Sequence, residues 1–226
     1  MNYKYKHSKL KSLKEENVKG ISVMVLIIII IIILFMCIGS QIDADLTLRL
    51  MKNNKFTNLL FVIPAFIVYN KISLIPAIES ANHKLKKKDI NSALIKLKND
   101  IESGIEKKFK NANSEKQKKR KNKYKFVQLE IKFRCYFELV KTQYTNEAKE
   151  NLDKTFEEII ALLEIMNEKE EQAYLYYNKG ISSEIIYNTN RLNEYKIEAQ
   201  NNYQKSMELS KNQEFINQAN KRLNNI

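Results

Sequence analysis

The side chains that could carry out chemistry are few in this chain and do not form a recognisable site. Its two histidines, His7 and His83, are isolated and do not belong to a metal-binding pattern or a catalytic triad. Its two cysteines, Cys37 and Cys135, form neither a metal-binding pair nor a disulfide framework. We therefore expect no catalytic residue, no metal site and no cofactor.

Phosphate-binding loops and paired catalytic carboxylates are not indicated either. The four glycines, at positions 20, 39, 104 and 180, do not form Gly-x4-Gly-Lys-Ser/Thr or Gly-x-Gly-x2-Gly. Glu168, Glu170 and Glu171 cluster, but acid–base catalysis needs buried carboxylates, and this run is typical of a solvated helix end. The sequence thus predicts a binding protein rather than an enzyme.

An unbroken apolar run from Ile21 to Ile38 is the strongest signal in the sequence. Eighteen residues in a helix rise about 27 Å, which nearly matches a bilayer core of about 30 Å. The lysine-rich residues before the run are typical of a cytoplasmic flank, and the run is too long for a cleaved signal peptide. We expect a basic cytoplasmic tail over 1–20 and a transmembrane helix over 21–39, in the cell (inner) membrane.

A second apolar stretch, 57–78 within the juxtamembrane segment 40–79, leaves the topology open. Burying Lys71 in a second span costs about 3 kcal/mol, but the lysines at 84, 86, 87 and 88 favour a return to the cytoplasm. We favour a single span and keep a two-span hairpin as the alternative, and this choice decides which side carries the C-terminal domain. Acylation of Cys37 is a further alternative, although Met36 stands where a lipoprotein signal has a small residue.

Composition favours an all-α fold after the membrane segments. Four glycines and two prolines leave few turn formers, while helix-forming residues abound. Apolar residues recur at helical spacing. We expect a helical segment at 80–103, a Lys-rich linker at 104–125 and a helical domain at 126–226.

Within the helical domain, residues 126–144 are ambiguous because they also alternate like a strand. The helical pattern covers more of them, so we favour a helix. Small polar breaks at 145–146 and 189–190 predict antiparallel hairpins. A polar helix from Gln213 to Leu223 is expected to close the chain.

The basic charge is concentrated in the first half of the chain. Residues 1–125 carry 26 Lys plus Arg against 10 Asp plus Glu, a net +16, whereas 126–226 carry 13 against 16, a net −3. The densest stretch, Lys116 to Lys125, could bind an anionic lipid surface or nucleic acid through Lys118, Lys119, Arg120 and Lys121. Few arginines and few interleaved aromatic residues argue against nucleic acid.

The helical hairpins resemble tetratricopeptide repeats. The best match is the third hairpin, where five residues approximate the helix-packing positions of the repeat: Tyr176, Gly180, Ala199, Tyr203 and Ser206. Weaker matches begin at Ala148 and Ala93, and the three alanines are 55 and 51 residues apart rather than about 34. The resemblance implies irregular TPR-like helical hairpins, with the last helix as a polar cap. A three-helix or four-helix bundle is the alternative.

The resemblance also implies that a protein partner binds the concave face made by the first helix of each hairpin. In the third hairpin that face includes Tyr174, Tyr177, Asn178, Ile181 and Glu184, with Asn178 where such repeats often grip a peptide backbone. Tyrosines suit such a surface, although Tyr174 and Tyr177 could instead pack between helices. The sequence predicts a membrane-anchored helical-repeat adaptor. The alternative function is a membrane-surface or nucleic-acid tether that acts through Lys116 to Lys125.

Overall fold

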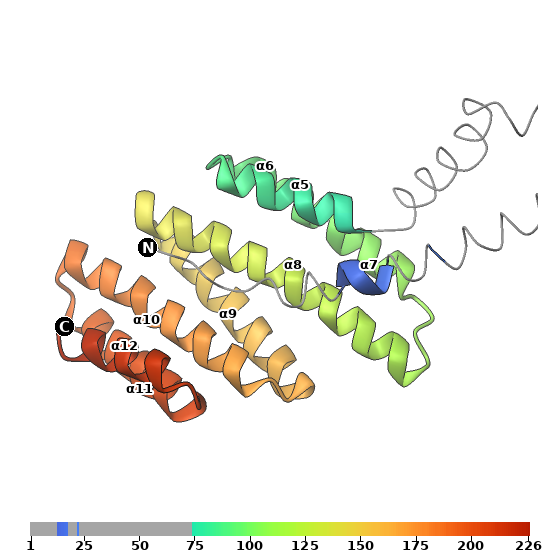
Figure 1. The fold of residues 1–226 in the computed structure, drawn as a ribbon. Coiled ribbons are helices and arrows are strands. Elements are labelled where there is room, and N and C mark those ends of the chain that lie inside the picture. The colour runs from blue at the N-terminus through green and yellow to red at the C-terminus, as the bar shows by residue number, and fades with distance from the viewer. Residues whose placement is uncertain (1–12, 18–21, 23–73) are drawn as a thin grey trace, which may run out of the picture. The chain divides into compact units, whose positions relative to one another are not determined.

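The computed structural model describes residues 13–17, 22 and 74–226. The chain divides into two compact units, Met1–Ala77 and Ile78–Ile226, and the second holds most of the described residues. In the described part, the regular elements from residue 74 onward are all helices and none is a strand (Figure 1). The expected all-α class is therefore confirmed.

The expected membrane segments fall almost wholly outside the described residues. Of the run from Ile21 to Ile38 only residue 22 is described, and of the alternative second span at 57–78 only residues 74–78 are described. Of these, residue 74 precedes helix α5 (Ile75–Lys86), and residues 75–78 form its first turn. Among the helices of the described residues, none is both long and apolar enough to cross a bilayer.

A tight turn reverses the chain after α5. Lys88 adopts a left-handed φ of 60°, and its N–H donates to the carbonyl of Leu85 at 2.9 Å. The Asp89 carboxylate then caps α6 (Ile90–Lys96) by accepting from the N–H of Ser92 at 3.3 Å. The helical rod continues through the π-helix η2 (Leu97–Glu102) into α7 (Ser103–Lys108). The single helical segment expected at 80–103 is thus two helical rods joined by a turn.

The structure differs from the Lys-rich linker expected at 104–125. A capping box begins α8 (Glu115–Thr142): the Ser114 hydroxyl accepts from the N–H of Gln117, and the Gln117 side chain accepts from the N–H of Ser114, both at 3.2 Å. The stretch from Lys116 to Lys125 forms the first turns of this 28-residue helix. Lysine is a good helix former, so a high charge density did not prevent the helix from extending.

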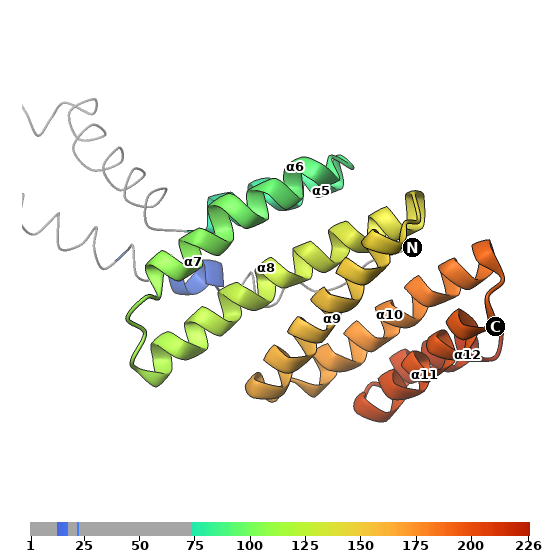
Figure 2. The same ribbon diagram turned by 180° about the vertical axis from the view of Figure 1, so that it is seen from behind.

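Helix α8 is the central helix of the second unit. It contacts α6, η2 and α7 as well as α9 (Asn146–Met166) and α10 (Lys169–Asn190) (Figures 1 and 2). Its buried residues lie on two opposite sides of the helix: Tyr124, Phe126, Val127, Gln128, Leu129, Ile131, Phe133, Cys135, Phe137 and Val140. A helix with two buried sides needs neighbouring helices on both of them. This explains why residues 126–144 also resemble a strand, and the helix predicted there is confirmed.

The helices after α8 begin and end at local capping signals. The Thr145 hydroxyl accepts from the N–H of Ala148 at 3.1 Å and starts α9, so the break expected at 145–146 is confirmed. Helix α10 continues through the break expected at 189–190 and stops at Arg191, whose φ is 58°. Helix α11 (Asn193–Leu209) follows, and α12 (Gln213–Leu223) has the bounds predicted from the sequence.

Helices α10 and α11 are in close contact at Gly180. A Cβ atom on this residue would lie 2.7 Å from Cε1 of Tyr203, so the Tyr203 ring fits only because position 180 has no side chain. Tyr203 is fully buried, as are Ala199 and Ser206 on the same helix. Small residues at a helix crossing let the two backbones come together while a large residue fills the groove.

Replacing Gly180 with alanine is expected to lower the free energy of unfolding by about 1–2 kcal/mol. Overpacking a core costs about 1–3 kcal/mol, and the better helix propensity of alanine offsets up to about 1 kcal/mol of that cost. Chemical denaturation followed by circular dichroism measures the change. In a Tyr203→Leu background the added methyl should cost much less; equal costs in the two backgrounds would contradict the close contact.

A buried carboxyl group lies within α8. The Oε1 atom of Glu130 is buried and, among the described residues, has no hydrogen-bond partner. Burial raises the pKa of Glu130 to about 7, although the positive charge of Arg134 acts in the opposite direction. Between the ordinary pKa of 4.5 and about 7, the folded chain therefore binds a proton that the unfolded chain has released.

The contribution of Glu130 to stability should consequently fall as the pH rises from about 5 to about 8, because ionisation is penalised only in the folded state. Glu130→Gln should be more stable than the wild type at about pH 8 by on the order of 2 kcal/mol, and should lose this part of the pH dependence. Denaturation at a series of pH values measures both effects. Glu157→Gln, on an exposed position of α9, is the control; the same change in both variants would contradict the assignment.

Candidate partner-binding site

The five residues predicted to bind a partner all lie on α10, but the structure gives them different surroundings. Asn178 and Ile181 are only 9% and 2% exposed, so they are not placed to contact a partner. Tyr174 packs against Phe215 of α12, with ring centroids 4.5 Å apart. Tyr177 also packs against Phe215, at 5.2 Å, but it remains partly exposed, as does Glu184. Helix α12 therefore covers much of the face that was expected to be open.

Arg222 of α12 joins Tyr177 and Glu184 in one polar network. Its Nε donates to the Tyr177 hydroxyl at 3.1 Å, and its Nη1 donates to Oε2 of Glu184 at 2.9 Å. The Tyr203 hydroxyl of α11 donates to the same carboxylate oxygen at 2.5 Å. Burial and the adjacent Glu184 carboxylate raise the pKa of Tyr203, so this hydroxyl keeps its proton and stays a donor. The network links three helices around one carboxylate.

A pocket of about 360 Å³ opens beside this network. Two lining residues come from α10, Tyr177 and Glu184, and the others come from α12 and the residue that follows its C-cap: Gln218, Lys221, Arg222 and Asn225. Gln218, Lys221 and Asn225 are exposed. Together these side chains offer hydrogen-bond donors and acceptors of the kinds that peptide groups and polar side chains use. The pocket is at the lower end of the size range of ligand sites.

The sequence pointed to two of the six lining residues and missed those contributed by α12 and the chain end. Helix α12 was expected only to cap the helices, because a polar composition does not separate a capping surface from a binding surface. One signal was present: Gln218, Lys221 or Arg222, and Asn225 recur every three or four residues, which places them on one side of a helix.

The residues predicted to bind an anionic surface lie at the start of α8. Lys118 and Lys119 are exposed, whereas Arg120 and Lys121 are half-buried. They are held by a capped helix rather than by a connector, so their relative positions are set by helical geometry.

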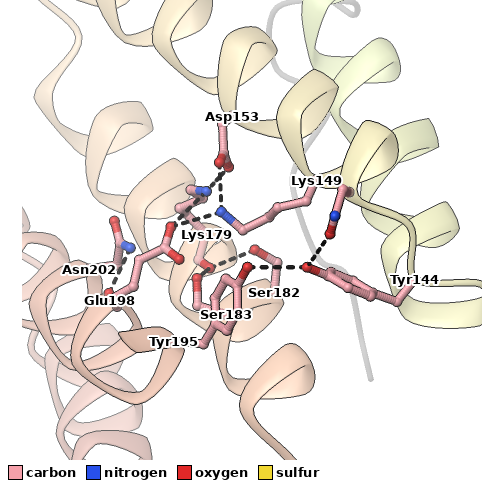
Figure 3. Close-up of polar contacts among 10 residues, drawn as sticks. Tyr144, Lys149, Asp153, Lys179, Ser182, Ser183, Tyr195, Glu198 and Asn202 are labelled. Carbon is pink, nitrogen blue, oxygen red and sulfur yellow. Dashed lines mark hydrogen bonds and ion pairs between the residues drawn. The ribbon is translucent and has the colours of Figure 1, made fainter. Parts of the chain in front are cut away.

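A cluster of four charges that the sequence did not indicate ties α9, α10 and α11 together (Figure 3). The Lys179 side chain of α10 is 5% exposed; its ammonium group contacts Asp153 of α9 and lies 2.9 Å from Glu198 of α11. Lys149 of α9 lies 2.6 Å from Asp153 and 3.3 Å from Glu198. The two ammonium groups and two carboxylates balance one another.

One aromatic ring lies near each of the two lysines of this cluster. The Lys179 ammonium lies 5.8 Å from the ring centroid of Phe156, and that of Lys149 lies 5.4 Å from the ring centroid of Tyr195. Burial lowers the pKa of Lys149, but Asp153 and Glu198 outweigh it and the net shift is upward. A hydrogen bond with Tyr144, at 3.1 Å, and burial raise the pKa of Tyr195 to about 12. Lys149 and Tyr195 thus keep their protons at neutral pH, as suits a structural tie.

Neutralising one carboxylate of the cluster should be costly. Asp153→Asn would leave Lys179 buried with Glu198 as its remaining counter-charge, and we expect the free energy of unfolding to fall by about 2–3 kcal/mol. The control is Glu208→Gln in the exposed pair Lys205–Glu208, which are 3.1 Å apart; it should change stability by less than about 1 kcal/mol. Chemical denaturation measures both, and equal effects would contradict a structural role for the cluster.

Metal-ligand geometry and the comparisons with known proteins do not indicate a function for the α10–α12 pocket. Across the described residues, no three side chains of His, Cys, Asp or Glu are grouped so that they could hold a metal ion. No protein-family model, curated protein or solved structure matches this chain. The geometry of the α10–α12 pocket, together with the sequence, is therefore the basis for a functional assignment.

Proposed function

We propose that this chain is a membrane-anchored helical adaptor whose α10–α12 pocket binds a segment of a partner protein. The observation that carries the proposal is the convergence of exposed polar side chains of α12 with Tyr177 and Glu184 of α10 around one pocket. Aromatic area beside amide and charged groups suits a peptide, which offers both apolar side chains and backbone hydrogen bonds.

The packing of the hairpins supports a TPR-like arrangement. Helices α9 and α11 bury the same pattern of a small residue, a large residue and a hydroxyl residue: Ala148, Leu152 and Thr155 in α9, and Ala199, Tyr203 and Ser206 in α11. If these are the second helices of two successive hairpins, then α8, α10 and α12 are first helices. The pocket lies between two of these first helices, where the resemblance to the repeat places a partner.

The membrane anchor in this proposal rests on the sequence. The apolar run from Ile21 to Ile38 and its lysine-rich flank are the reasons for it. The lack of a catalytic pattern in the sequence supports a binding role rather than an enzymatic one. The helical unit would then be tethered to the bilayer by this anchor.

Site-specific photocrosslinking in cells tests the pocket. A photoreactive amino acid replaces Gln218, which lines the pocket, or Gln204, an exposed position of α11. We expect the full-length chain to form a defined crosslinked product from position 218 and not from position 204, and mass spectrometry identifies the partner. Equal crosslinking from both positions, or none from position 218, would argue against the pocket as a binding site.

A matched pair of double substitutions then measures the contribution of the pocket. Lys221→Ala with Asn225→Ala removes two exposed hydrogen-bonding groups from the pocket and should weaken binding of the identified partner about tenfold. Asn201→Ala with Lys205→Ala removes the same residue types, four positions apart, from α11. This control should leave the affinity unchanged, with circular dichroism showing that both variants remain folded.

A further inference from the structure

Three helix ends lie at one end of the unit Ile78–Ile226. Helix α5 runs away from this end, the rod of α6, η2 and α7 returns to it, and α8 starts from it after the connection at 109–114 (Figures 1 and 2). We call this the basal end. The C-terminus lies at the opposite end (Figure 1). Asn225, which lines the α10–α12 pocket, is the residue before it.

The basal end carries a concentration of exposed lysines. They come from the end of α7, the connection and the start of α8: Lys107, Lys110, Lys116, Lys118 and Lys119. The exposed acidic residues beside them are Glu106 and Glu115. The capping box at Ser114 and Gln117 holds the first turn of α8, so its lysines are presented from an ordered helix.

The sequence connects this basic surface to the membrane segments. The chain enters α5 at the basal end directly from the apolar stretch at 57–78, which follows the run from Ile21 to Ile38. We propose that the basal end docks on the anionic headgroups of the bilayer through the exposed lysines of α7 and α8. This inference rests on the membrane anchor of the proposed function.

The docking is favoured by charge and by geometry. A lysine held close to an anionic leaflet gains about 1 kcal/mol, and the attraction extends only about one Debye length. An anchor that precedes α5 in the sequence tethers the basal end to the same bilayer. The opposite end, with the C-terminus, then faces away from the lipid, which leaves the α10–α12 pocket open to a partner.

A single introduced tryptophan can report the docking because the chain has none. Full-length protein carrying Asn113→Trp, in the basal connection, or Asn91→Trp, near the start of α6 at the other end, is reconstituted into vesicles. The vesicles contain phosphatidylcholine alone or with phosphatidylglycerol, and a lipid with a nitroxide on its headgroup quenches nearby tryptophan. We expect quenching at position 113 with phosphatidylglycerol, little without it, and little at position 91 in either case. Added salt should relieve the quenching.

Two matched triple substitutions separate docking from a general effect of charge. Lys116→Gln, Lys118→Gln and Lys119→Gln remove three exposed lysines from the basal end, and Lys86→Gln, Lys87→Gln and Lys88→Gln remove three from the turn at the other end. The first set should weaken docking about fivefold per lysine, and so about a hundredfold in all. The second set should leave the quenching of Trp at position 113 unchanged.

Two results would overturn the proposal. These are equal quenching with and without phosphatidylglycerol, and equal losses in the two triple variants. Flotation of the vesicles at high salt tests the anchor separately, since a transmembrane helix survives salt and headgroup docking does not. Quenching without flotation at high salt would retain the docking but contradict the anchor, and the photocrosslinking at position 218 is independent of both.

Discussion

The packing of the C-terminal helices depends on two buried lysines, Lys149 and Lys179, whose ammonium groups require negatively charged partners. Removing one partner from a buried ion pair costs several kcal/mol, so Lys179 and Lys149 must keep carboxylates within reach. Asp153 comes from α9 and Glu198 from α11, so the cluster is complete only when α9, α10 and α11 are in one relative register (Figure 3). Gly180, the next residue along α10, then lets α11 approach closely enough for Tyr203 to fill the crossing.

The position of the pocket follows from that crossing. Tyr203 is buried against Gly180, and its hydroxyl reaches Glu184 one turn further along α10. Glu184 in turn accepts a hydrogen bond from Arg222, while Phe215 packs on Tyr174 and Tyr177. Helix α12 is thus oriented by contacts at both of its ends. Because these contacts include Glu184, which is bound by Tyr203, the α10–α11 crossing helps to set the position of the pocket beside Arg222.

The central helix α8 also packs against the rod of α6, η2 and α7. Its two buried sides are covered by α6, η2 and α7 together with α9 and α10, so both groups of helices pack on the same central helix. A helix of this length also separates the basic start of α8 from the region of the pocket. In the proposed function this separation would hold the partner site away from the lipid surface.

The features that could be predicted from the sequence are those that local interactions decide. The helical class, the helix at 126–144, the start of α9 after Thr145 and the bounds of α12 follow from helical periodicity, few turn formers and capping residues, all of which act within one or two turns. The expected linker at 104–125 failed for a local reason as well. A capping box at Ser114 and Gln117 was present, and lysine continues a helix readily, but the charge density was given more weight.

What only the tertiary structure decided are the contacts between helices. Lys179 meets Asp153 across 26 positions of sequence, and Lys149 meets Glu198 across 49, so no spacing rule could pair them. For the same reason the sequence placed Asn178 and Ile181 on a binding face, whereas neighbouring helices bury both residues. A helix carries its periodicity within its own residues, but which of its faces becomes core and which becomes surface depends on how distant segments pack against it.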